Sequence, residues 1–197
     1  MATVVELPPP VHGPAMTPHH RRIRLASRGL AWLFSGLLVV VGLIAAVLIA
    51  GVVIYPGDDY RIGSTAVWIG SGSADSVAFH TLPLGQRLAY AVVGAVRIAP
   101  TLMIFWHLRR LFGLYATGVV FSRANASHIG WSGAWLAAYA VTPFLCHLFL
   151  ASLGWEIDKN WLHLSSLQAL ILGALVFVIA QVMQVGREIE EDREAFV

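Results

Sequence analysis

The sequence predicts an all-α, polytopic membrane protein with four transmembrane helices and with its N- and C-termini in the cytoplasm. Three observations lead to this prediction. The composition is too apolar for a water-soluble globule. Four apolar segments are each long enough to cross a bilayer as helices. The basic residues gather on one side of these segments, which sets their orientation.

The composition limits the class of protein first. The 197 residues are 57% apolar and only 12% charged, with a mean hydropathy of +0.71. Soluble domains carry about 25% charged residues. Because half of that charge is missing, the chain lacks the polar surface that a water-facing globule needs. This excludes a soluble enzyme, a disordered chain and a disulfide scaffold, and we expect the single Cys146 to be a small core residue.

Four segments are long and apolar enough to span the membrane. They are residues 30–54, 88–106, 129–153 and 162–185. About 20 apolar residues suffice to cross the hydrocarbon as a helix. Within a bilayer each span must satisfy its own backbone hydrogen bonds, so we expect helices. The sequence lacks the alternating pattern of barrel strands, which argues against an outer-membrane barrel.

The remaining segments complete the domain plan. Residues 1–29 are rich in proline and arginine, and we expect them to be disordered. Residues 30–197 form one membrane domain. Within it, residues 55–87 make an outer loop rich in glycine and serine, in which no pattern points to a ligand. Residues 107–128 make a cytoplasmic hairpin.

The basic residues orient the spans. Nine of the 13 Lys and Arg residues lie before the first span, between the second and third spans, or after the fourth. Three lie on the opposite side, and Arg97 lies within a span. Since basic loops stay in the cytoplasm, we expect both termini and the hairpin there.

The hairpin has clear start and stop signals. Apolar residues keep helical spacing beyond Arg109 and Arg110, so we expect the second helix to extend about two turns past the membrane. Gly118 would end it, because a left-handed C-terminal position costs glycine little. Ser122 would cap the next helix by accepting a backbone N–H. Phe121 would pack back on that helix as a hydrophobic staple.

The hairpin residues also carry a resemblance to a known family. The chain resembles the YoaS-like family of bacterial four-helix membrane proteins, which is catalogued as a domain of unknown function. The residues that carry the match are Arg109, Arg110, Leu111, Phe112, Tyr115, Gly118, Phe121, Ser122, Asn125 and Gly130. The resemblance covers roughly residues 30–197, although the charged ending departs from the usual Leu-Thr-aliphatic pattern. It implies a bacterial cytoplasmic (inner) membrane location and brings no catalytic residue.

The resemblance also implies a class of partner. Members are often encoded beside a small helix-turn-helix repressor of the Cro type. We therefore expect a non-enzymatic protein that acts by sensing or interaction, in which the hairpin and the acidic tail, residues 186–197, control such a regulator. The expected partners are the lipid bilayer and this regulator, without direct contact to nucleic acid, and a homo-oligomer stays open. No cofactor is expected, and the simpler interpretation is that these charges only set topology.

Arg97 is the main anomaly of the spans. A charge near the bilayer centre costs about 2.5–3.5 kcal/mol on insertion scales, and the four spans contain no Asp or Glu. One interpretation is a site for an anionic lipid or a polar cavity. The other is that Arg97 snorkels or bonds neighbouring carbonyls, one of which Pro100 frees. Candidate hydrogen-bond partners are Tyr90, Tyr139, Gln168 and Gln181.

Two alternative functions stay open at this stage. His107 and His128 lie near the inner boundary, and His147 and His163 lie near the outer one, which suggests a haem-binding or redox membrane protein. Prolines within the second and third spans suggest a small transporter component. The sequence has no H-E-x-x-H, P-loop or nucleophile-elbow motif, so no catalytic or metal-binding residues are assigned.

Overall fold

The computed structural model describes residues 18–63, 67–70, 76–118, 122–155 and 164–195. Within this part of the chain four helices are long and apolar enough to cross a membrane. Their bounds are α1 (Pro18–Ile54), α2 (Leu84–Thr117), α3 (Arg123–Ser152) and α4 (Leu164–Ala195). The prediction of four long, apolar helices is therefore confirmed.

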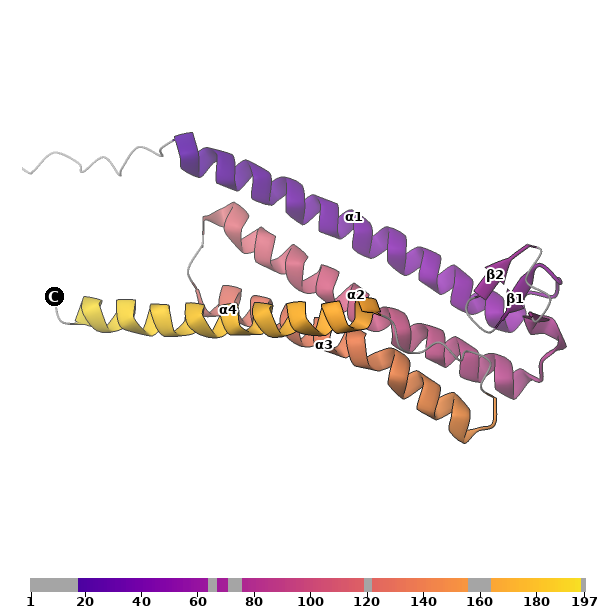
Figure 1. Cartoon of the computed structure of the whole chain (residues 1–197). Coiled ribbons are helices and arrows are strands. Elements are labelled where there is room, and N and C mark those ends of the chain that lie inside the picture. The colour runs from indigo at the N-terminus through magenta and orange to yellow at the C-terminus, as the bar shows by residue number, and fades with distance from the viewer. Residues whose placement is uncertain (1–17, 64–66, 71–75, 119–121, 156–163, 196–197) are drawn as a thin grey trace, which may run out of the picture.

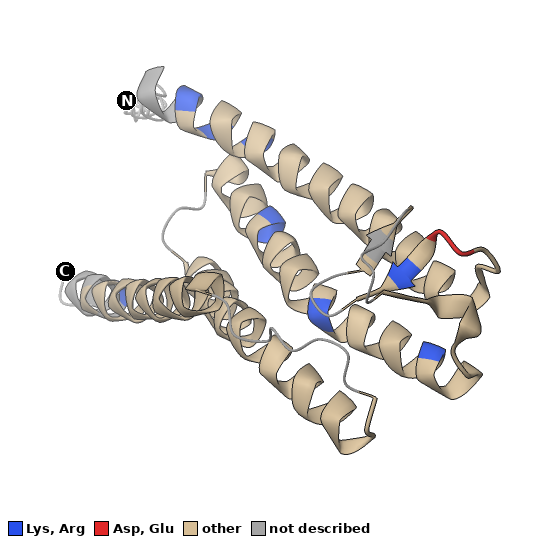
Figure 2. Cartoon of the chain, turned by 45° about the vertical axis from the view of Figure 1, so that its right-hand side comes forward, with Lys and Arg blue, Asp and Glu red and all other residues tan. Residues whose placement is uncertain are grey.

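The helices form a row in chain order. Helix α1 packs on α2, α2 on α3, and α3 on α4 (Figure 1). The start of α1, the end of α2, the start of α3 and the end of α4 lie at one end of the molecule (Figure 1), which we call the inner end after the predicted orientation. Blue basic residues mark this end of α1 in Figure 2, and others lie along α2 and in the outer segment. The opposite, outer end carries a small β-sheet.

Helix α1 begins earlier than the sequence indicated. Residues 18–29, which we expected to be disordered, are helical. The reason is tertiary, because the Arg24 Nε donates to the Ala116 carbonyl at the end of α2, over 3.1 Å, and Ser27 is buried. These contacts offset the entropy of ordering the segment. Residues 1–17 lie outside the described residues.

Helices α2 and α3 run unbroken through Pro100 and Pro143. The discontinuous helices that mark many transporter sites are not formed at these two prolines. Helix α4 also continues past Gly186 to Ala195, where we expected a charged tail. Glutamate and arginine are good helix formers, so the tail can extend the helix.

Two glycines set the crossing of α3 and α4. A Cβ atom added at Gly133 would lie 2.7 Å from the Gly173 carbonyl oxygen, and one added at Gly173 would lie 2.8 Å from the Gly133 carbonyl oxygen. The two backbones therefore touch, as small residues allow in membrane helix packing.

The outer loop folds into a small antiparallel sheet that the all-α prediction missed. Its strands are β1 (Tyr60–Ile62), β2 (Val67–Ile69) and β3 (Val77–Ala78), in the order β2-β1-β3, followed by the short 3-10 helix η1 (Phe79–Thr81). Strand β1 pairs Tyr60 with Ile69 and Arg61 with Ala78. Strands of two or three residues are too short to give a clear periodic signal.

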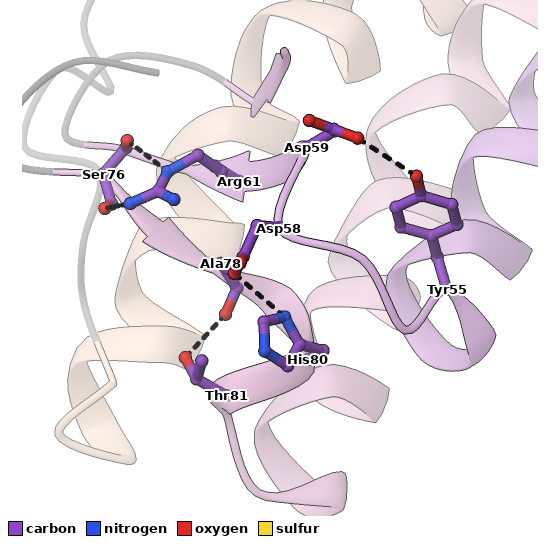
Figure 3. A network of polar contacts seen from close by, with 8 residues as sticks. All are labelled: Tyr55, Asp58, Asp59, Arg61, Ser76, Ala78, His80 and Thr81. Carbon is purple, nitrogen blue, oxygen red and sulfur yellow. Dashed lines mark hydrogen bonds and ion pairs between the residues drawn. The ribbon is translucent and has the colours of Figure 1, made fainter. Parts of the chain in front are cut away.

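Polar contacts join parts of the outer segment to one another (Figure 3). The Arg61 side chain donates from Nε to the Ser76 hydroxyl over 2.9 Å and from a terminal nitrogen to the Ser76 carbonyl over 2.6 Å. His80 lies 3.6 Å from the Asp58 carboxylate. Below them Phe79 is only 1% exposed, with ring centroids 5.1 Å from Tyr60 and 6.0 Å from Tyr90. The best-buried apolar cluster of the described residues thus lies at the outer end, between the sheet and the helices.

Candidate functional sites

The inner hairpin forms as the sequence predicts. Gly118 ends α2 in the left-handed conformation, with φ of 92°, and its N–H bonds the Tyr115 carbonyl. The Ser122 hydroxyl accepts the backbone N–H of Asn125 over 3.2 Å and caps α3. Both local predictions are confirmed. The expected staple at Phe121 lies outside the described residues.

Most of the family-motif residues build the hairpin rather than its surface. Leu111 is buried and Asn125 is fully buried. Phe112 stacks on Phe34 of α1, with ring centroids 5.7 Å apart, and meets Tyr115 edge-on. Gly130 lies against Ala180 of α4. These contacts dock the hairpin on α1 and α4, which gives the motif a structural reason.

Arg109 and Arg110 are the charged residues of the motif, and both are exposed. They line a hollow of about 610 Å³ between α1 and the hairpin, which we call the inner cleft. Trp32 of α1 and His128 of α3 line it as well. The Arg110 guanidinium lies 4.9 Å from the centre of the Trp106 ring, in a cation–π contact.

The structure brings one histidine pair together. The Nδ1 atoms of His107 and His128 are 3.1 Å apart, and the His107 ring stacks on Trp131 at 6.2 Å. The two imidazoles therefore contact each other directly, with ring centroids 5.3 Å apart. For the second pair, His147 lies on α3 and His163 lies outside the described residues. Groups of three or more metal-ligating side chains are not found among the residues described.

Arg97 lines another hollow, nearer the outer end. This membrane cavity, of about 560 Å³, lies between α1 and α2 under the small sheet. Its walls are mainly apolar, and its polar groups include Thr101 of α2 and Tyr139 of α3. Pockets of 300–1,000 Å³ with apolar walls and a few polar groups are typical of ligand sites.

Arg97 and Tyr139 also line a second hollow, of about 220 Å³, on the side of α4. Ser165 and Ser166 of α4 line it too. Of the candidate partners named from the sequence, Tyr139 lies beside Arg97 in both hollows, whereas the Tyr90 hydroxyl donates to the Trp155 carbonyl. Arg97 thus lies between an apolar cavity and a more polar one.

The roof of the membrane cavity consists of residues that sequence reasoning missed. Tyr60, Ile62 and Phe79 line it from the outer segment. The available signals were the short apolar-flanked runs 60–62 and 67–69, each followed by a glycine. They were too short to distinguish from a loop.

Comparison with known proteins places the chain at the level of a family. Residues 55–197 match the model of the family described as "Protein of unknown function (DUF2975)". No curated protein and no solved structure matches the chain. The matched part includes the outer sheet, the hairpin and α2 to α4.

Proposed function

The chain belongs to the DUF2975 family, and we propose that it is a non-enzymatic sensor of the bacterial inner membrane that binds an anionic amphiphile in the membrane cavity. Binding of this ligand changes how the inner end of the protein binds a small helix-turn-helix regulator. The observation that carries this proposal is the place of Arg97, which is the charged residue lining a mainly apolar cavity of about 560 Å³.

The chemistry of the cavity selects the ligand class. Its walls bury an acyl chain, because they come from apolar residues of α1, α2 and the sheet. A carboxylate head would sit at Arg97, where the low dielectric strengthens a charge-assisted hydrogen bond. An intramembrane cation of this kind is a functional site by default.

Photolabelling tests the proposal. The purified protein in phosphatidylcholine nanodiscs is exposed to a diazirine fatty acid or to its methyl ester. We expect the acid to label peptides of α1 and α2 that line the cavity, and Arg97→Leu to reduce this labelling about tenfold, the effect of losing a charge-assisted bond. Labelling by the ester should change little.

Val96→Leu is the matched control, because Val96 is the neighbouring residue on α2 and is 47% exposed. It should label as the wild type does. Equal labelling of wild type and Arg97→Leu by the acid would refute the proposed ligand class. Thermal unfolding in detergent confirms that each variant is folded.

The output at the inner end is the second part of the proposal. The start of α1, the ends of α2 and α3 that form the hairpin, and the end of α4 all lie at this end of the molecule (Figure 1). Helix α4 continues through the acidic segment 188–194, which contains five carboxylates. Such a segment suits the basic surface of a DNA-binding regulator.

A pull-down tests this output with a purified helix-turn-helix repressor of the Cro type, the class of partner that the family resemblance implies. Compared with the full chain, a variant truncated after Arg187 should retain much less regulator. A full-length variant in which residues 188–194 carry glutamine and asparagine in place of the acids should behave like the truncation. Retention of the regulator by both variants would exclude the tail as its binding site.

A further inference from the structure

The inner cleft contains Arg109 and Arg110, the two exposed arginines of the family motif. Arg109 and Arg110 of α2 and His128 of α3 line it, opposite Trp32 and Ser35 of α1. None of the residues lining this described cleft is an acid. We propose that the inner cleft is a binding site for a phosphate group, independent of the Arg97 cavity.

The side chains of Arg110 and His128 are positioned by neighbouring residues before any ligand binds. The cation–π contact with Trp106 positions the Arg110 guanidinium. The contact with His107 positions the His128 ring. When His128 accepts the shared proton at Nδ1, its Nε2 carries an N–H that can donate to an anion. Preorganised donors lower the entropy cost of binding.

The side chains of the inner cleft suit a phosphate group. A guanidinium offers two parallel N–H donors to phosphate oxygens, and two adjacent arginines supply two such forks. The Ser35 hydroxyl donates to the Ala31 carbonyl over 2.7 Å, so it is not counted among the phosphate donors. The binding groups are therefore Arg109, Arg110 and His128.

The cleft lies at the depth of lipid headgroups. Arg109 follows Arg97 by 12 residues, or about 18 Å along the helix axis, and stands just past the predicted end of its span. Trp32 borders the cleft and is 80% exposed, as befits an aromatic residue at the membrane interface. Basic pockets between helices on the cytoplasmic side bind anionic headgroups. The phosphate group can thus belong to a lipid or to a soluble phosphate.

The experiment measures binding to the full chain in nanodiscs. One arm titrates fluorescent phosphatidylglycerol into phosphatidylcholine nanodiscs, and the other adds inorganic phosphate as a competitor. Arg109→Gln with Arg110→Gln should weaken phosphatidylglycerol binding by about tenfold or more. Competition by phosphate would identify a soluble phosphate as a ligand of the same site, and lack of competition would assign the site to the lipid.

Arg123→Gln with Arg187→Gln is the matched control, since it removes two arginines at the same end that line a different hollow. It should change binding less than about twofold. Equal losses in the two double variants would overturn the proposal, because general surface charge would explain the binding. Unchanged binding by the Arg109/Arg110 double variant would overturn it as well.

Two further measurements distinguish paired hydrogen bonding from charge alone, and the inner cleft from the Arg97 cavity. Arg109→Lys with Arg110→Lys keeps the charge but loses the paired donors, and should bind with an intermediate loss. In the other direction, Arg109→Gln with Arg110→Gln should leave the labelling of the Arg97 cavity by the diazirine fatty acid unchanged. A failure of this proposal is thereby distinguishable from a failure of the fatty-acid proposal.

Discussion

His107 of α2 and His128 of α3 contact each other through their Nδ1 atoms over 3.1 Å. This contact joins the two helices of the hairpin where they leave the predicted membrane region. A single hydrogen bond can fill this gap only when one nitrogen carries the proton and the other accepts it. The contact is therefore compatible with at most one positive charge on the pair.

Acidification should separate the two helices at this contact. Full protonation places two imidazolium ions side by side, beside Arg110, and two unit charges 4 Å apart repel by about 4 kcal/mol near a protein surface. The contact should hold at neutral pH and be lost as the pH falls well below about 6.5. Distances between spin labels at Thr117→Cys and Ala124→Cys, in a Cys146→Ser background, measure the opening.

The control for the pH experiment is His107→Phe, which keeps a ring stacked against Trp131 and removes one titrating group. Its label distance should not change with pH over the same range. A wild-type distance that is equally insensitive to pH would contradict the role of the pair.

The α3–α4 crossing should be the packing contact most sensitive to a single methyl group. Gly133→Ala places its Cβ 2.7 Å from the Gly173 carbonyl oxygen, so the helices must move apart. Overpacking of this kind costs about 1–3 kcal/mol. Thermal unfolding in detergent should show the loss. Gly36→Ala is the control, because an added Cβ there meets nothing within 4 Å, and stability should be unchanged or slightly higher.

Ionisation of Tyr60 should lower the stability of the protein at alkaline pH. Burial raises the pKa of the Tyr60 phenol above its ordinary value of about 10. Because the raised pKa means that the folded protein favours the neutral phenol, the stability from Tyr60 is fully present below pH 10. It is lost as the pH rises through the raised pKa.

Tyr60→Phe tests this link. The variant loses the hydrogen bond from the Tyr60 hydroxyl to the Leu48 carbonyl, which is 2.9 Å long, and should be about 1 kcal/mol less stable at neutral pH. Its unfolding temperature should fall less steeply than the wild type's above pH 10. Tyr55→Phe is the control at an exposed position and should match the wild type at neutral pH.

The Ser122 cap should contribute to the stability of the hairpin. Ser122→Ala removes the acceptor for the Asn125 N–H and should cost about 1 kcal/mol. Ser127→Ala, at an exposed position within the same helix, should cost much less. Hydrogen exchange of the first turn of α3 measures the difference, and equal exchange in both variants would argue against the cap.

Local signals predicted the hairpin, and non-local contacts decided what lies beside it. A glycine after the last helical residue and a serine before the next helix act within one turn, so the ends of α2 and α3 followed from the sequence. The early start of α1 did not, because it depends on Arg24 reaching Ala116, 92 residues away. The outer sheet was missed because two- and three-residue strands gain their stability from packing on Phe79 and the helices.

The sequence by itself determined the number of membrane spans, the hairpin turn and the side on which basic residues gather. Each of these depends on transfer free energies or on conformational preferences summed over neighbouring residues. Only the tertiary structure decided that Arg97 lines a cavity, that Arg109 and Arg110 share a cleft with His128, and that His128 contacts His107. Those relationships depend on the angle and depth at which α1 and α3 pack against α2, which no local pattern encodes.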